Sequence, residues 1–172
     1  MQRTMSSKEI AKYTDQIENP SEIFKIFLHD YVTGNSWIRS RGDEDISVWD
    51  KLKGNELAIA KQIILDELKT VPDGSYMRAI SIFKDKRAIP ILTSLIDTLP
   101  YLDLKLLAAK SLYDITGYKE YVPMLEAACK NHDDDMLYNY LKYSISQFTC
   151  GLKKRDKIKI MIALGEPFLG KV

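Results

Sequence analysis

The chain has 172 residues, of which 45% are hydrophobic and 28% are charged. This balance provides a packed core and excludes a disordered chain, and no apolar run reaches the roughly 18 residues that a membrane-spanning helix needs. The net charge is +1, so no global field draws the chain onto nucleic acid. Residues 1–12 are polar and lack the apolar stretch of a secretory signal, which predicts a cytoplasmic protein.

The charge is uneven along the chain. Residues 1–50 carry 6 basic and 9 acidic side chains, whereas residues 151–172 carry 6 basic and 2 acidic ones, so the two ends are expected to present surfaces of opposite sign. The two cysteines, Cys129 and Cys150, are expected to be reduced thiols. With His29 and His132 they occur singly, and no metal-ligand spacing results.

The spacing of apolar residues predicts a helix over residues 21–34. Ser21 is placed to cap its first turn and Gly34 to end it. Its apolar stripe comprises Phe24, Phe27, Leu28 and Tyr31. The pattern then breaks, and residues 34–53 are expected to form a long loop with one short helical turn near Trp49.

Two further helices are predicted before residue 84. The first begins at Asn55 and ends at the turn Pro72-Asp73-Gly74. Its buried face is expected to comprise Leu57, Ala60, Ile63, Ile64, Leu68 and Val71. A shorter helix follows, with Met77, Ile80 and Phe83 inside.

A pair of helices is predicted over residues 85–117. Pro90 fits the first turn of the first helix, where a missing N–H costs little, and Pro100 helps to end that helix. Asp103 is the expected cap of the second helix and Gly117 its C-terminal stop. The two apolar faces comprise Ala88, Ile89, Leu92, Leu95, Ile96 and Leu99, and then Leu104, Leu107, Ala108, Ser111, Leu112 and Ile115.

The same pattern repeats over residues 121–148. Pro123 again lies in a first turn, as Pro90 does, and residues 132–135 make the turn and the next cap. The step from one proline to the other is typical of the period of a solenoid, in which each unit buries its face on its neighbours. The two faces comprise Tyr121, Leu125, Ala128 and Cys129, and then Leu137, Tyr140, Leu141, Ser144, Ile145 and Phe148. Behind the basic residues 153–155, Ile158, Met161 and Ile162 indicate a short terminal helix that caps the stack.

Residues 85–117 resemble a HEAT-type repeat. The resemblance is carried by Ala88-Ile89-Pro90-x-Leu92, by Asp103 between the helices, and by Leu107-Ala108-Ala109-x-x-Leu112, whose alanines let helices approach closely. The next repeat matches in Val122-Pro123-x-Leu125 but has Asn139-Tyr140 in place of the alanine pair, and residues 56–83 match more loosely.

The resemblance implies an all-α fold, an α-α superhelix of stacked HEAT-like helix pairs. We interpret residues 1–172 as a single helical-repeat domain. Within it, residues 1–54 form irregular helices and a loop, residues 55–150 form the HEAT-like pairs, and residues 151–172 form a capping helix.

In overall type, though not in any motif, the chain also resembles the small helical-repeat immunity proteins of bacterial toxin systems, including contact-dependent inhibition. That resemblance implies a cytoplasmic protein that binds and neutralises a cognate toxin domain, for instance a nuclease. A HEAT-repeat scaffold or adaptor subunit is the alternative, because a fold does not specify a function.

No catalytic constellation rises above background. The sequence contains no complete P-loop signature G-x-x-x-x-G-K-[ST], because Val172 follows the one G-x-x-x-x-G-K string at residues 165–171, and it has no G-x-G-x-x-G fingerprint and no G-x-S-x-G elbow. Asp133-Asp134-Asp135 lacks the glycine and the later glutamate of an EF-hand, so it is expected to be a solvated turn that caps the next helix. We therefore predict no catalytic residue, no cofactor, no metal and no enzyme activity.

HEAT-like DNA glycosylases, which hold DNA in a basic groove, are the enzyme alternative. The second helices of the predicted pairs carry Lys105, Lys110 and Lys142, but they also carry Asp103, Asp114 and the Asp133–Asp135 triplet. Binding through phosphates needs a clear positive surplus, so the charge pattern argues against a nucleic-acid partner.

The first predicted partner-binding region is the helix that bears three of the ten tyrosines. Tyr140 falls on its core stripe, whereas Tyr138, Lys142, Tyr143 and Gln147 lean off that stripe. Tyrosine is common among interface hot spots, and second helices, including the one with Lys105, line the usual binding face of stacked repeats. The alternative interpretation is peripheral packing with hydrated hydroxyls.

The second predicted region is the loop over residues 37–50, which combines aromatic anchors with charges. Its candidate contacts are Trp37, Arg39, Arg41, Asp43, Glu44, Asp45 and Trp49. Such an acidic loop can mimic phosphate towards a basic toxin. The alternative is that its tryptophans fold back to cover the first helix pair.

Overall fold

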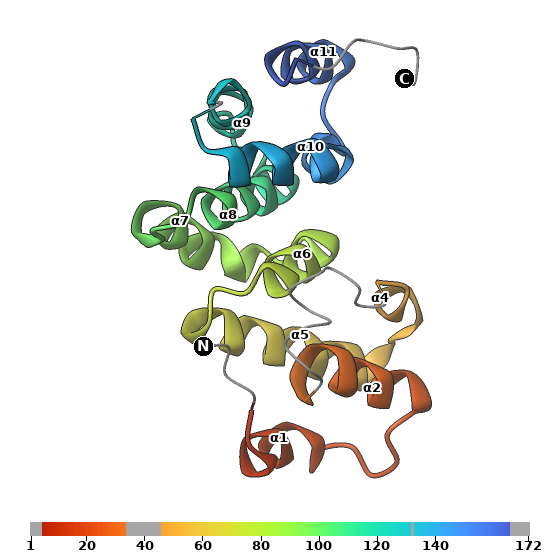
Figure 1. Cartoon of the computed structure of the whole chain (residues 1–172). Helices are drawn as coiled ribbons and strands as arrows, with labels where there is room; N and C mark the ends of the chain where they lie inside the picture. Colours follow the sequence, from red (N-terminus) through yellow and green to blue (C-terminus); the bar gives the residue numbers. More distant parts are fainter. Residues whose placement is uncertain (1–4, 34–45, 132, 166–172) are drawn as a thin grey trace. The chain divides into compact units, whose positions relative to one another are not determined.

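The computed structural model describes residues 5–33, 46–131 and 133–165. Every regular element in these ranges is helical and none is a strand, so the predicted all-α class is confirmed for the part of the chain described. The helices fall into two compact units, Met1–Ile91 and Leu92–Val172, and each is described by itself (Figure 1).

Unit 1 is built around α5 (Gly54–Thr70). Helices α1 (Ser7–Thr14), α2 (Glu22–Phe27) and α6 (Gly74–Phe83) pack on α5, and α4 (Val48–Lys51) packs on α2 and α6 (Figure 1). Because α5 has neighbours on several sides, most of its apolar residues are buried, including Ala60, Ile63 and Ile64 with no exposed surface. The predicted helix from Asn55, the turn at residues 72–74 and the short helical turn at Trp49 are confirmed.

Helix α1 lies in the part of the chain for which irregular helices were predicted without bounds. It begins with a capping box, in which the Ser6 hydroxyl accepts from the amide of Glu9 at 3.4 Å and the Glu9 carboxylate accepts from the amide of Ser6 at 2.8 Å. The S-x-x-E spacing is a sequence signal for a helix start. The N-terminal residues are therefore more regular than their polar composition suggested.

The predicted helix over residues 21–34 changes type halfway. Ser21 caps α2 as expected, with its hydroxyl accepting from the amide of Phe24 at 3.1 Å. After Phe27 the chain continues as a π-helix, η1 (Leu28–Thr33), in which the Thr33 hydroxyl donates to the carbonyl of Leu28 at 3.2 Å. The wider turn leaves Tyr31 and Val32 buried at 1% exposure each. Gly34, the expected stop, lies outside the described residues.

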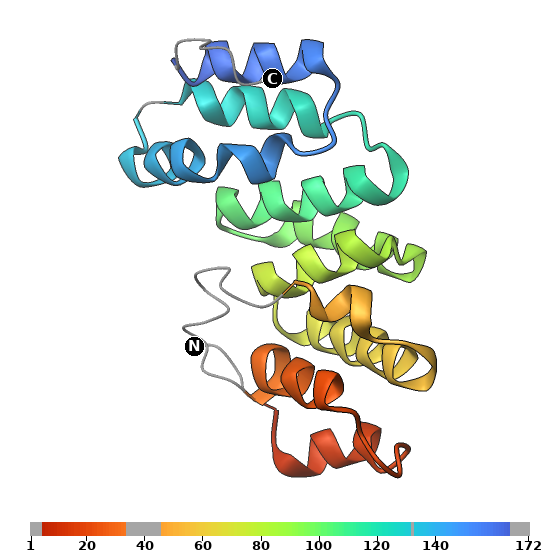
Figure 2. The same ribbon diagram turned by 90° about the vertical axis from the view of Figure 1, so that its right-hand side faces the viewer.

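Unit 2 contains most of α7 (Ile89–Thr98) and all of the four helices after it. Helix α7 follows a short 3₁₀ turn, η2 (Lys86–Ala88). The four helices after α7 are α8 (Leu102–Thr116), α9 (Tyr121–Lys130), α10 (Asp135–Thr149) and α11 (Lys154–Ala163). Helix α9 packs on α8, α10 and α11, and α10 also packs on α8 (Figure 2).

The bounds of the second helices of the two predicted pairs are separated by the predicted interval, whereas the bounds of the first helices, α7 and α9, are separated by one residue less. Both α8 and α10 have 15 residues, and the bounds of α10 follow those of α8 by the interval that separates Pro123 from Pro90, from Leu102 to Asp135 and from Thr116 to Thr149. In this register Leu141 and Lys142 take the places of the alanine pair, so the assignment of Asn139-Tyr140 to those places is wrong. Ala108 and Ala109 are fully buried, as the close approach of helices requires.

Two details of α8 differ from the prediction. Tyr101, not Asp103, is its N-cap residue, and Asp103 lies inside the first turn, where a carboxylate faces the positive end of the helix dipole. All residues from Leu106 to Leu112 are buried, because α9 and α10 both cover the helix, so no single stripe exists there. Gly117 is confirmed as the C-terminal stop, with φ at 76°.

The predicted terminal helix is present as α11, and the structure shows which of its apolar residues are covered. Ile160 and Leu164 have no exposed surface and Ala163 is 9% exposed, whereas Ile162, one of the apolar residues that indicated this helix, is 68% exposed. Apolar residues lie on most sides of this short helix, so its packing against α9 decides which of them are covered.

Candidate protein-binding surface

The predicted loop contacts are only partly placed. Trp37, Arg39, Arg41, Asp43, Glu44 and Asp45 lie outside the described residues. Trp49 is described and lies in the core of unit 1 at 5% exposure, where its Nε1–H donates to the Tyr31 hydroxyl at 3.0 Å. Its ring makes edge contacts with Phe27, Tyr31 and Phe83 at centroid distances of 5.2, 4.9 and 4.2 Å. For Trp49, the interpretation as a residue folded back onto the first helices fits this environment.

Several tyrosine side chains form hydrogen bonds between helices inside each unit. In unit 1 the Tyr76 hydroxyl donates to the carbonyl of Tyr31 at 3.1 Å. In unit 2 the Tyr121 hydroxyl donates to the carbonyl of Phe148 at 2.6 Å and has a raised pKa, because burial disfavours the charged phenolate. Much of the tyrosine content therefore serves core packing with satisfied hydroxyls.

Tyr138, a predicted anchor, also belongs to this group. It is half-buried, and its hydroxyl donates to the carbonyl of Leu164, just past the end of α11, at 2.9 Å. This bond ties α10 to the last described turn of the chain. The residue therefore positions α11 in this structure.

In contrast to Tyr138, the side chain of Tyr143 is exposed to solvent, at 87%. Gln147 follows it by one helical turn and is half-buried, while Lys142 is exposed on another side of α10. Lys105 is half-buried on α8. Among the residues predicted to bind a partner, Tyr143 and Gln147 are four positions apart and therefore share one face of α10.

One strongly exposed residue was missed by the sequence analysis. Met136 is 83% exposed and lies two helical turns before Tyr143, so the two share a face of α10. Tyr140, half-buried with its ring edge-on to Phe148 at 5.8 Å, lies between them. We call Met136, Tyr140, Tyr143 and Gln147, at positions i, i+4, i+7 and i+11, the outer stripe of α10. Their spacing was the signal that could have identified Met136.

The outer stripe has an acidic end. Asp133, Asp134 and Asp135 are exposed beside Met136 at the start of α10. Asp134 caps the helix as predicted, because its Oδ1 accepts from the amide of Leu137 at 2.9 Å. The carboxylates of Asp133 and Asp135 extend the negative charge on either side of the cap.

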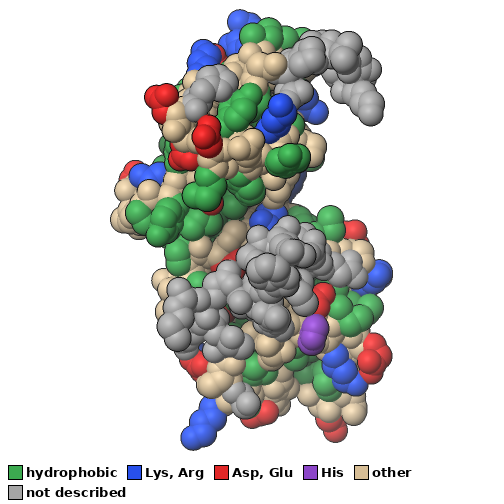
Figure 3. Space-filling view, viewed as in Figure 1, with side chains coloured by type: hydrophobic (Ala, Val, Ile, Leu, Met, Phe, Trp, Pro, Cys, Tyr) green, Lys and Arg blue, Asp and Glu red, His purple; other side chains and the backbone are tan. Residues whose placement is uncertain are grey.

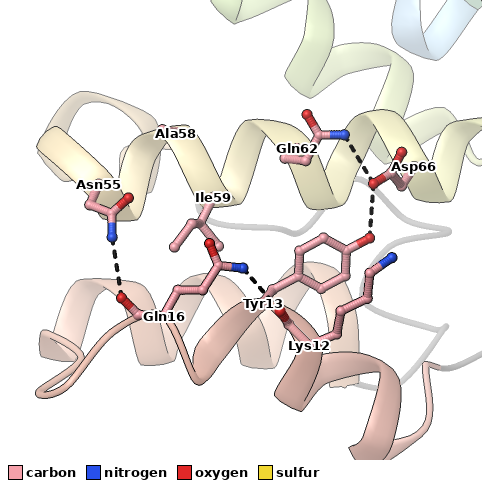
Figure 4. A pocket seen from close by; sticks show the side chains of 8 residues that line it. All are labelled: Lys12, Tyr13, Gln16, Asn55, Ala58, Ile59, Gln62 and Asp66. Carbon is pink, nitrogen blue, oxygen red and sulfur yellow. Dashed lines mark hydrogen bonds between the residues drawn. The ribbon is translucent and has the colours of Figure 1, made fainter.

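Unit 1 contains a pocket of about 390 Å³ between α1 and α5, lined by Lys12, Tyr13, Gln16, Asn55, Ala58, Ile59, Gln62 and Asp66 (Figure 4). Its polar groups point at one another. The Asp66 carboxylate accepts from the Tyr13 hydroxyl at 2.9 Å, from the Gln62 amide at 3.0 Å and from the Lys69 ammonium at 2.8 Å.

Further bonds close this network. The side-chain Oε1 of Gln62 accepts from the Arg87 guanidinium at 3.0 Å, and the side-chain amide of Asn55 donates to the backbone carbonyl of Gln16 at 3.4 Å. The groups that would orient a ligand are thus engaged in holding α1 on α5, and we regard this network as a structural clamp.

Other kinds of site were searched for in the described residues. No group of three or more His, Cys, Asp or Glu side chains in residues 5–33, 46–131 and 133–165 is arranged to hold a metal ion. His29 contacts Asp30 at 2.8 Å on an exposed part of η1, and His132 lies outside the described part. Among the helices described, none is long and apolar enough to cross a membrane. Comparisons with models of protein families, with curated proteins and with solved structures found no match to this chain.

Proposed function

We propose that this chain is a protein-binding module and that the outer stripe of α10 is part of its contact surface. The observation that carries the proposal is the exposure of Met136 at 83% and Tyr143 at 87% on one helical face. Two large apolar side chains held in water on one face gain free energy when a partner covers them. Anchors at i, i+4 and i+7 are typical of a helix that lies in an apolar groove of its partner.

We propose further that the helix pairs stack as a HEAT-like superhelix. The support is the constant interval between the bounds of α8 and those of α10, together with the fully buried Ala108-Ala109 pair. In such an array the second helix of each pair lines the face that binds partners, and α10 is a second helix.

The narrower proposal is a cytoplasmic immunity protein that neutralises a cognate bacterial toxin. The acidic end of the outer stripe supports a basic partner, of which a nuclease domain is one kind, because opposite potentials speed and orient association. A scaffold or adaptor subunit would use the same apolar stripe. The glycosylase alternative gains no support, because Lys110, one of the three lysines considered for it, is buried at 8% exposure and paired with Asp114.

The experiment is co-expression of the chain with the toxin candidate encoded beside its gene. Growth rescue by the wild-type chain is expected, and so is loss of rescue by the double variant Met136→Ser with Tyr143→Ser. The matched control is Tyr101→Ser, which removes another tyrosine of unit 2 that is 66% exposed. Circular dichroism checks that all variants are folded.

Three outcomes separate the proposals. No rescue by the wild-type chain discards the immunity function. Capture of an endogenous partner that is lost with the double variant, without any toxin, supports the scaffold alternative. Unchanged partner affinity of the folded double variant rejects the outer stripe as a contact surface.

A further inference from the structure

Helix α11 begins in a dense group of cations. Lys153, Lys154 and Arg155 are exposed, and Lys157 and Lys159 follow within the next turn, with Asp156 as the one acid of residues 153–159. Figure 3 shows Lys and Arg side chains gathered around the end of unit 2 where α11 lies. The group is the strongest local concentration of like charge in the described part of the chain.

These cations form no ion pairs with described residues of unit 2, unlike other lysines there. Lys110 pairs with Asp114 and Lys130 pairs with Glu126 at 2.6 Å, whereas no cation of residues 153–159 forms an ion pair with a described residue. The nearest influence is on Glu126 of α9. The pKa of Glu126 is lowered first by its hydrogen bond from Lys130 and to a smaller extent by the charge of Lys159.

The cations also occupy the end of the helix where they do least for its stability. Lys153 is the N-cap residue and makes no side-chain cap, and Lys154 and Arg155 lie in the first turn. The helix dipole is positive there, so these side chains disfavour the helix instead of stabilising it. A requirement of folding therefore does not explain their position.

The outward side of α11 combines charge with one apolar residue. Arg155, Lys159 and Ile162 follow at i, i+4 and i+7, and all three are exposed, Ile162 at 68%. Ile160 and Leu164 on the other side are fully buried and hold the helix on the rest of unit 2. Lys153 and Lys154 are exposed at the N-terminal end of the helix and not on this side, and we use the name basic face of α11 for the five exposed residues Lys153, Lys154, Arg155, Lys159 and Ile162 together.

We propose that the basic face of α11 docks an acidic segment of a partner protein, independently of the outer stripe of α10. Charge complementarity identifies the occupant, because carboxylates of a partner would supply the counter-charges that unit 2 does not provide. The exposed isoleucine gives such a segment an apolar contact among the cations.

Two other polyanions fit this face less well. Residues 92–172 have 11 basic and 10 acidic side chains, so the broad positive surplus that a nucleic-acid duplex needs is missing. A lipid surface needs a long apolar face, but α11 has 10 residues and turns Ile160, Ala163 and Leu164 into the protein.

The test measures binding of a short labelled peptide of glutamates and leucines by fluorescence anisotropy. The variant is Lys153→Gln with Lys154→Gln and Arg155→Gln. The control is Lys8→Gln with Lys86→Gln and Lys119→Gln, which removes the same charge from exposed positions elsewhere. We expect the affinity to fall about tenfold or more in the α11 variant and less than about twofold in the control. Ile162→Ser should weaken binding with all charges retained.

Parallel titrations use a DNA duplex and vesicles containing phosphatidylserine. Equal weakening by the two triple variants, or tighter binding of either polyanion than of the peptide, overturns the proposal. Thermal melting of the α11 variant gives a separate readout. We expect an unchanged or higher melting temperature, and a clear fall would show that the cations serve the fold and would also overturn the proposal.

Discussion

The hydroxyl of Tyr13 on α1 donates a hydrogen bond of 2.9 Å to the carboxylate of Asp66 on α5, and it joins residues that are 53 positions apart (Figure 4). Tyr13 is 8% exposed, and the same carboxylate accepts from Gln62 and Lys69. The bond therefore fixes the most N-terminal described helix to the central helix of unit 1 through a polar centre with several donors.

Replacement of Tyr13 by Phe tests this clamp. We expect the free energy of unfolding of unit 1 to fall by about 1.5 kcal/mol, since the variant removes a hydrogen bond to a charged group but keeps the ring. Amide exchange in α1 should accelerate more than in α6. Tyr101→Phe, which alters a tyrosine that is 66% exposed, is the control and should leave both measurements unchanged.

The difference in stability between the wild-type chain and Tyr13→Phe should depend on pH. Burial, followed by the hydrogen bond to Asp66, raises the pKa of Tyr13 from 10.0 to about 12. The protonated Tyr13 therefore makes its full contribution to the free energy of unfolding below pH 10, and this contribution is lost as the pH rises through 12. Burial alone would raise the pKa of Asp66, but the bonds from Gln62, Lys69 and Tyr13 lower it. The contribution of the Asp66 carboxylate to the free energy of unfolding is thus lost as the pH falls through that lowered pKa. Denaturant unfolding across the pH range should give a bell-shaped difference, and a flat one would contradict the role of the pair.

The elements that the sequence predicted correctly are those with local signals. The caps at Ser21 and Asp134, the stop at Gly117 and the repeat that relates α10 to α8 all depend on side chains within one or two turns of the feature. Such signals act before any tertiary contact forms. They indicated that residues 55–150 and the end of the chain form helices, which the structure has.

What the sequence left open was decided by neighbours in space. Ile162 is exposed and Ile160 is buried because α9 covers one side of a helix whose apolar residues lie all round. Trp49 turns inward because Phe27 and Tyr31 offer it an aromatic site, and Tyr138 finds the carbonyl of Leu164. For the candidate surface, periodicity identified Tyr143 and Gln147 but could not separate a tyrosine that packs from one that is exposed.

The environment of Trp49 leads to a spectroscopic prediction. In a Trp37→Phe background Trp49 is the only tryptophan, and its emission should lie at short wavelength because the ring is excluded from water. Truncation of Trp49 to Ala should cost about 3–5 kcal/mol of unfolding free energy, since it empties a site between Phe27, Tyr31 and Phe83. Emission at the wavelength of free tryptophan in the folded protein would contradict the burial.

The two thiols should differ sharply in reactivity. Cys150 is exposed, whereas Cys129 is fully buried in α9, and burial raises its pKa to about 11. The thiolate is the reactive form, so at neutral pH a thiol reagent should label Cys150 rapidly and Cys129 only at the rate of unfolding. Cys150→Ser should abolish the rapid phase, while Cys129→Ser should leave it intact.

The pair of Lys110 and Asp114 in α8 allows a test of whether a buried ion pair stabilises this fold. Lys110 is 8% exposed, and its ammonium donates to both carboxylate oxygens of Asp114. Lys110→Met should destabilise unit 2 by about 3 kcal/mol, because it leaves the carboxylate partly buried without its counter-charge. The double variant Lys110→Met with Asp114→Leu should recover most of that loss, since apolar side chains replace both charges. Denaturant unfolding of the two single variants and the double variant measures the coupling, and equal stability of Lys110→Met and the wild-type chain would mean that solvent screens the pair.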